Sequence, residues 1–132
     1  MDETLRETAY PFLVHLGMTM EDWSDGRARF RLPIAPHLMN RHGNPHGGAH
    51  AALLDTVMGY AGCWTGDPDR PQLCLTLSLT VQYLSRPRGT AFIGEGTKTG
   101  EGQSTCYAEG TVSDDTGDLI ARVAGVFRYR EA

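Results

Sequence analysis

The sequence predicts an α+β domain in which an antiparallel sheet wraps around one long helix. Residues 46–62 are apolar on nearly every side of a helix, which is typical of a helix buried in the middle of a domain. One segment before this helix and four segments after it alternate polar and apolar residues, which is the period of β-strands. A chain of 132 residues suffices for one core, so we expect a single domain over residues 1–132.

The part of the chain before the long helix is expected to hold short helical turns and one strand. Residues 4–16 carry spaced apolar side chains around Pro11, which predicts one or two helical turns that pack as a lid or brace. Residues 23–34 contain an alternating run that predicts a half-buried strand. The turn-rich segment 40–45 then leads into the helix.

The part of the chain after the helix predicts four strands joined by short links. Gly-rich turns separate the last three of them, and successive strands with short links favour an antiparallel meander, in which each strand pairs with the next. The four segments are residues 73–84, 90–98, 103–113 and 119–130.

Composition argues against several kinds of partner. A net charge of −4 and a pI near 5.7 disfavour nucleic acid. We expect no membrane contact, because no run of about 18 apolar residues occurs, and no signal peptide, because the N-terminus is acidic. Three cysteines are an odd number in segments that predict core or sheet, so we expect free thiols and a cytoplasmic protein. These are Cys63, Cys74 and Cys106.

Two features of the helical segment point to a functional site. Asp55 is a carboxylate in an apolar helix, where desolvation is costly unless the group is hydrogen-bonded, and such sites are enriched in function. At the helix start, Gly47 and Gly48 carry backbone N–H groups without intrahelical partners, and the helix dipole favours a bound oxyanion there. A tight turn against a neighbouring strand is the alternative explanation for the two glycines.

The two ends of this motif cannot act on one atom within a single chain. Eight residue steps separate Gly47 from Asp55, which is roughly 12 Å along a helix axis and far beyond the ~3 Å reach of shared chemistry. If both act on one substrate, one of them must come from a second chain. The spacing therefore predicts a site at a subunit interface of a homo-oligomer.

A metal site is the competing interpretation, since His42, His46 and His50 recur every four residues near Asp55. Pro45 disfavours helix at the residue before it, so His42 is not expected to share a helix face with the other two. Two imidazoles and a distant acid make a poor zinc site. We therefore expect neither a metal nor another cofactor, apart from coenzyme A as part of a substrate.

These residues form a motif with a family resemblance. The pattern Asn40-x5-His46-Gly47-Gly48-x6-Asp55-Thr56-x2-Gly59, with the strand that ends in Tyr83-Leu84-Ser85-Arg86-Pro87, resembles the hotdog-fold acyl-CoA thioesterases. It is most similar to the phenylacetate-pathway (PaaI-like) branch of the 4-hydroxybenzoyl-CoA thioesterase superfamily, over about residues 10–130. The resemblance implies a hotdog fold, metal-free hydrolysis of acyl-CoA to free acid and CoA, and a homodimer or a tetramer of two dimers.

The resemblance also implies roles for individual residues. The Gly47 amide and the Asn40 side chain would hold the thioester carbonyl oxygen, and His46 would orient the loop. Asp55, with the hydroxyl of Thr76 as its partner, would attack the thioester or deprotonate water, and the sequence leaves both routes open. The implied substrate-binding residues are Gly48 at the helix start and, along the edge that meets coenzyme A in relatives, Arg86, Arg88, Gly102, Gln103 and Ser104.

Two further functions stay open beside the thioesterase. One is a non-catalytic hotdog protein that binds acyl thioesters or small ligands, against which the joint presence of Asn40, Gly47 and Asp55 speaks. The other is a hotdog dehydratase acting on 3-hydroxyacyl thioesters, whose paired histidine and acid motifs are not found in this sequence. A pocket lined by Leu, Met and Tyr would suit aryl and aliphatic acyl groups alike.

Overall fold

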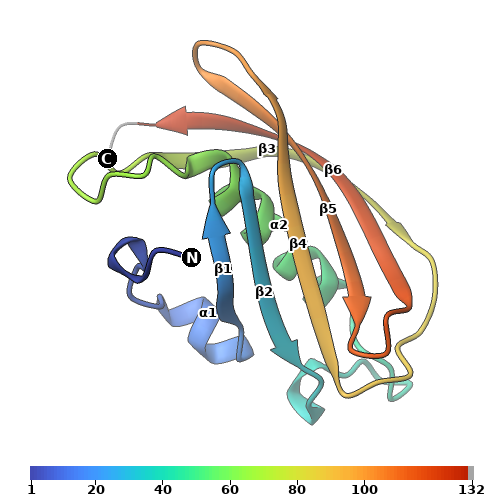
Figure 1. The fold of residues 1–132 in the computed structure, drawn as a ribbon. Helices are drawn as coiled ribbons and strands as arrows, with labels where there is room; N and C mark the ends of the chain where they lie inside the picture. Colours follow the sequence, from blue (N-terminus) through green and yellow to red (C-terminus); the bar gives the residue numbers. More distant parts are fainter. Residues whose placement is uncertain (131–132) are drawn as a thin grey trace.

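A computed structural model describes residues 1–130 and shows one six-stranded antiparallel sheet curved around the long helix α2 (Figure 1). The predicted fold class is confirmed. The elements are η1 (Glu3–Leu5), α1 (Pro11–Leu16), β1 (Thr19–Ser24), β2 (Arg27–Pro33), η2 (Pro36–Leu38), α2 (Gly47–Cys63), β3 (Leu73–Tyr83), β4 (Ala91–Glu101), β5 (Thr105–Asp114) and β6 (Leu119–Arg130).

Helix α2 lies tightly against the concave face of the sheet. Its side chains Leu53, Leu54 and Val57 are fully buried in the core. A Cβ on Gly96 of β4 would lie 2.5 Å from the Val57 carbonyl oxygen, so only glycine lets the strand and helix backbones approach this closely. The position of the helix is therefore fixed by the sheet, and with it the positions of the residues at its start and middle.

The order of the strands in the sheet is β1-β2-β4-β5-β6-β3, so the predicted meander is wrong in its first link. Strand β3 pairs with β6 at one edge of the sheet, not with β4. The reason is the path of α2, which carries the chain from β2 across the sheet face to the far edge. The amides of Leu84 and Ser85 still bind the Ile120 carbonyl oxygen, at 2.8 and 3.2 Å, before the chain crosses back to β4.

Strand β1 is absent from the sequence prediction. It pairs with β2 through a turn at Gly26, whose φ is +70°. A bulge between Met20 and Asp22 breaks the alternation that marks a strand, which explains why the pattern is hidden. The Asp25-Gly26 turn was the signal that could have revealed it.

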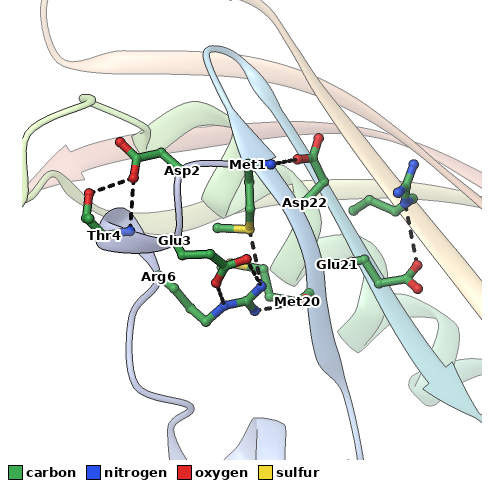
Figure 2. A network of polar contacts seen from close by, with 9 residues as sticks. Met1, Asp2, Glu3, Thr4, Arg6, Met20, Glu21 and Asp22 are labelled. Atoms are coloured by element: carbon green, nitrogen blue, oxygen red, sulfur yellow. Dashed lines mark hydrogen bonds and ion pairs between the residues drawn. The ribbon is translucent and has the colours of Figure 1, made fainter.

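The N-terminal segment braces the outer edge of β1, in agreement with the predicted brace. Arg6 donates a hydrogen bond of 2.8 Å to the Met20 carbonyl oxygen of β1 and pairs with Glu3 at 2.7 Å (Figure 2). Asp2 caps η1 by accepting from the amide and hydroxyl of Thr4. This contact covers part of a sheet edge that would otherwise expose free backbone carbonyls.

No helix within residues 1–130 combines the length and apolar character needed to cross a membrane.

Candidate active site

The start of α2 leaves one backbone amide free for a ligand. His46 is the N-cap: its Nδ1 accepts the Gly48 N–H at 2.8 Å, and its carbonyl oxygen accepts the Ala49 N–H at 2.9 Å. Within the described chain, the Gly47 N–H donates to no protein group. Of the predicted pair, Gly47 thus has a free amide, whereas the Gly48 amide is already occupied by His46.

Asn40 is held in a defined orientation by the loop that precedes α2. Its Oδ1 accepts hydrogen bonds from the amides of His42, at 2.9 Å, and Asn44, at 3.1 Å. The loop is closed by the His46 amide, which donates to the Leu38 carbonyl oxygen at 2.7 Å. Because the side-chain oxygen is engaged, the Nδ2 group of Asn40 is left as a donor, with no partner among residues 1–130.

Tyr83 is a site residue that the sequence reasoning did not identify, although it stands in the family motif. Its hydroxyl donates a 2.6 Å hydrogen bond to the Gly47 carbonyl oxygen. A Cβ on Gly47 would lie 3.2 Å from the Tyr83 ring, which is tighter than most real contacts. Tyr83, at the end of β3, therefore fixes the first turn of α2, and its close contact favours a glycine there.

The histidines near the helix start support the local structure. His50 is 5% exposed and packs between the rings of Tyr83 and Phe92, at centroid distances of 5.4 and 4.8 Å. Burial lowers the pKa of His50, so its ring is neutral at pH 7. In the part of the chain that the structure describes, no three His, Cys, Asp or Glu side chains are placed to hold a metal ion.

Asp55 and Thr76 meet across the space between α2 and β3. The Thr76 hydroxyl donates a 2.6 Å hydrogen bond to Asp55 Oδ1. The sequence suggested that Asp55 is buried, but in the single chain it is half-exposed on the floor of a cleft. A β-bulge between Thr76 and Ser78 changes which residues of β3 face the helix and turns the threonine toward Asp55.

The cleft beside Asp55 has a volume of about 610 Å³. One face of α2 forms its floor, the first half of β3 forms one wall, and the N-terminal segment and β1 form the other. The wall is largely aromatic at the end away from Asp55. The lining residues are Glu7, Tyr10, Trp23, Asp55, Thr56, Gly59, Tyr60, Cys63, Gln72, Leu73, Cys74, Thr76, Phe127 and Arg130.

Two of the three free cysteines lie in this cleft. Hydrogen bonding to Cys74, together with burial, raises the pKa of the Cys63 thiol, so Cys63 is protonated at neutral pH. Cys106 is fully buried, and burial raises its pKa as well. The hydrogen bond with Cys63 lowers the pKa of the Cys74 thiol. No pattern in the sequence indicates that Cys63 and Cys74 lie together.

The residues expected to contact coenzyme A fall into two groups at opposite ends of the sheet. Arg86 and Arg88 precede β4, whereas Gly102, Gln103 and Ser104 form the turn that follows it. The length of β4 separates them by roughly 33 Å at 3.3 Å per residue. Arg88 is engaged by Asp118 at 2.6 Å, while Arg86 is exposed. One chain therefore cannot bring both groups to the same phosphate.

No protein-family model matches the chain. A presumed esterase of Halobacterium salinarum is 38% identical over 80 residues, which cover 58% of this chain and 53% of that protein. The match thus spans about half the length of the curated relative.

Solved structures share the fold over nearly the whole chain. A Bacillus halodurans protein solved with CoA has a TM-score of 0.80 and 28% identity, covering 98% of this chain and 85% of that one. The PaaI protein of Escherichia coli, from the phenylacetic acid degradation operon, has a TM-score of 0.80 and 16% identity, covering 92% and 85%. Proteins named as thioesterases from Staphylococcus aureus and Haemophilus influenzae have the same fold.

These comparisons show that the chain has the hotdog fold of proteins named as thioesterases, which is the fold that the resemblance in the sequence implied. The similarity to PaaI is one of fold and is consistent with the PaaI-like branch. The names carried by the neighbours and by the curated relative fit a thioester hydrolase.

Proposed function

We propose that this protein is an acyl-CoA thioesterase, which hydrolyses acyl-CoA to a free acid and CoA without a metal, at a site shared between two subunits. One observation carries the proposal. The chain holds a free amide at Gly47 with the oriented Asn40 donor at one end of α2, and a hydrogen-bonded carboxylate at Asp55 in the middle. These are the two halves of a thioester hydrolase, held too far apart to act within one chain.

Strand β3 supplies the surface on which a second copy can complete the site. It is the last strand of the sheet, so the backbone groups of its outer edge have no strand partner within residues 1–130. It also exposes apolar side chains, Leu75 at 52% and Leu77 at 56%. A long, apolar, unpaired edge is suited to antiparallel pairing with the same edge of a second copy.

Pairing of this kind would bring the two halves together. Antiparallel β3 strands that meet near their centre, at Ser78, place the Tyr83 end of one strand opposite the Leu73 end of the other. Gly47, which is bonded to Tyr83, then approaches the partner subunit's Asp55 and Thr76. The same arrangement places Arg86 of one subunit at the end of the sheet where the other subunit carries the turn of Gly102 to Ser104.

The chemistry follows from these positions. The Gly47 N–H and Asn40 Nδ2 would donate to the thioester carbonyl oxygen and stabilise the oxyanion of the tetrahedral intermediate. Asp55, held by Thr76, would take a proton from a water that attacks the carbonyl carbon. The C–S bond then breaks, and Asp55 passes this proton to the departing CoA thiolate. In the alternative route Asp55 attacks the carbonyl carbon itself, the C–S bond breaks and the CoA thiolate leaves. Water then hydrolyses the resulting anhydride, which regenerates Asp55, releases the free acid and supplies the proton that the thiolate takes up.

Thiol release from a panel of aryl and aliphatic acyl-CoAs tests the activity. We expect the wild type to release thiol. In Asp55→Asn the rate of thiol release should fall at least a hundred-fold, which corresponds to roughly 2.7 kcal/mol, while fold and assembly stay intact. Full activity of Asp55→Asn would refute the assignment. Tight binding of an acyl-CoA without thiol release would instead favour the non-catalytic binding protein. A conjugated enoyl product from 3-hydroxyacyl-CoA would favour the dehydratase.

Subunit complementation tests the shared site. Asp55→Asn and Asn40→Ala are each expected to be inactive, but mixed dimers would contain one intact site. After unfolding and refolding of an equal mixture, about a quarter of wild-type activity should return, because half of the dimers are mixed and each has one good site. The two variants carry different affinity tags, so that capture through both tags in succession isolates the hybrid dimers. No recovery of activity in these hybrids would place both residues in a site within one chain.

We further propose that the protein works in the cytoplasm as a dimer or a dimer of dimers. Its three cysteines are unpaired in the structure, as suits a reducing compartment.

A further inference from the structure

Gly59 holds an unusual position in the cleft. Asp55, Gly59 and Cys63 follow one another at four-residue intervals along the face of α2 that forms the cleft floor. Gly59 is therefore the one position of this row without a side chain, directly between the carboxylate and the far end of the cleft. The floor is lowest at this point.

The fold itself does not require glycine at this position. Its φ is not positive, and a Cβ built on it would meet only Cys74 Sγ, at 3.7 Å, which is ordinary contact. In a helix interior, glycine is less favourable than alanine. Gly62, one turn further on, differs: a Cβ there would lie 2.7 Å from Cys106 Sγ, so packing alone explains it.

The far end of the cleft has an aromatic wall that is fixed by its contacts. Tyr60 is fixed by Trp23, whose ring lies edge-on at 5.1 Å and whose Nε1 donates to the Tyr60 carbonyl oxygen at 2.7 Å. The Tyr60 hydroxyl donates to Glu7 of the N-terminal segment at 3.2 Å. That segment is held on β1 by the Arg6 contacts of Figure 2, so the far wall is continuous with the brace.

We propose that Gly59 is a specificity-determining residue that sets the width of the acyl group. This rests on the proposed function. With the thioester carbon at Asp55 and Thr76, the acyl group lies across Gly59 and ends against Tyr60 and Trp23. The missing side chain admits acyl groups broader than a linear chain, which carry a ring or a branch close to the carbonyl.

Gly59→Ala tests the proposal with two thioesters, cyclohexylacetyl-CoA, whose acyl group is broad, and butanoyl-CoA, whose acyl group is a linear chain. The ratio of their kcat/KM values is expected to fall about ten-fold, the effect of one carbon in a fitted pocket. The midpoint of thermal unfolding should stay the same or rise, because alanine is the better helix former. A ratio within two-fold of the wild type would overturn the proposal. So would an equal loss for both esters, which would place the pantetheine arm of CoA in the cleft.

Gly62→Ala is the matched control, the same substitution three residues along the same helix. It is expected to lower the unfolding midpoint through its clash with Cys106 and to leave the ratio of the two esters unchanged. If the wild type releases no thiol from either ester, the proposed function fails separately. Calorimetric binding of the same two esters to wild type and Gly59→Ala then tests the acyl cleft, with an unchanged affinity ratio overturning it.

Discussion

Replacement of Thr76 by valine isolates the hydrogen bond that orients the proposed catalytic carboxylate, Asp55. Valine keeps the shape of threonine and removes only the hydroxyl that donates to Asp55 Oδ1 at 2.6 Å. A hydrogen bond to a charged group contributes roughly 1.5–3 kcal/mol, and at 1.4 kcal/mol for each factor of ten this is about 12- to 140-fold. We expect kcat of Thr76→Val to fall within this range, because Asp55 loses its fixed orientation at the reacting carbon.

The assay is thiol release from the best acyl-CoA of the panel, with Thr76→Ser beside Thr76→Val. Serine restores the hydroxyl and should recover most of kcat, which a merely structural role of the methyl group would not explain. Thr76 lies on an exposed edge strand, so the unfolding midpoint should change little in either variant. A Thr76→Val enzyme within three-fold of the wild type, or a serine variant no better than valine, would show that the hydroxyl does not serve Asp55.

Three further predictions concern assembly, the helix start and pH. Ser78→Arg should place two guanidinium groups near the proposed two-fold axis, so that light scattering finds monomers and thiol release disappears with them; an active monomer would contradict the shared site. Tyr83→Phe should lower the free energy of unfolding in urea by about 1 kcal/mol and reduce kcat, since the Gly47 carbonyl oxygen loses its 2.6 Å donor; unchanged values for both would show that the ring alone positions the turn. The hydroxyl of Thr116 and the amides of Arg88 and Gly89 lower the pKa of Asp114 below its ordinary value of 3.8. A lowered pKa in the folded state means that this carboxylate stabilises the fold above about pH 3.8 and that the contribution is lost as the pH falls through the folded-state pKa. Asp114→Asn should therefore unfold at lower temperature than the wild type at pH 7, with the difference narrowing below pH 3.8; a difference that is constant with pH would assign the effect to geometry rather than charge.

The sequence allowed the fold class and the ends of most elements to be predicted, because they depend on local periodicity. The helix was expected over 46–62 and is found at Gly47–Cys63, and the strand expected over 73–84 is β3. The pairing of β3 was not accessible in this way. Which edge a strand joins depends on the path of the preceding helix across the sheet, and neither alternation nor link length records that path.

The same limit applies to the site, where β3 gives the clearest case. Its sequence alternates without interruption from Leu73 to Tyr83. In the structure, the bulge after Thr76 changes the phase, so Leu75 and Leu77 are exposed while Leu79 packs against the core. An uninterrupted strand that buried Leu79 would have turned Thr76 away from Asp55. The pairing of Thr76 with Asp55 was therefore predicted from the family resemblance, whereas the periodicity of the strand would have predicted that the two side chains do not meet.

Residues whose importance depends on contacts between distant segments could not be found from local patterns. Tyr83 meets Gly47 over 36 positions of sequence, and Glu7 meets Tyr60 over 53. Neither contact leaves a local trace, since a tyrosine at a strand end and a glutamate near the N-terminus are common. By contrast, Asp55 was identifiable because a carboxylate in an apolar helix is locally anomalous.

Gly47 and Asp55 lie on one rigid helix, so the activity of the proposed site should depend on the concentration of the protein. Because α2 is packed against the sheet with no room to bend, a single chain cannot close the distance of roughly 12 Å between Gly47 and Asp55 by a conformational change. If the site is shared as we propose, assembly is the only route to a complete site. The surface proposed to drive assembly, the exposed edge and leucines of β3, belongs to the same strand that carries Thr76 and Tyr83. Stability of the dimer and competence of the site are thus coupled through one element. Specific activity should fall on dilution in step with the fraction of dimer, whereas a site completed within one chain would keep its specific activity at every concentration.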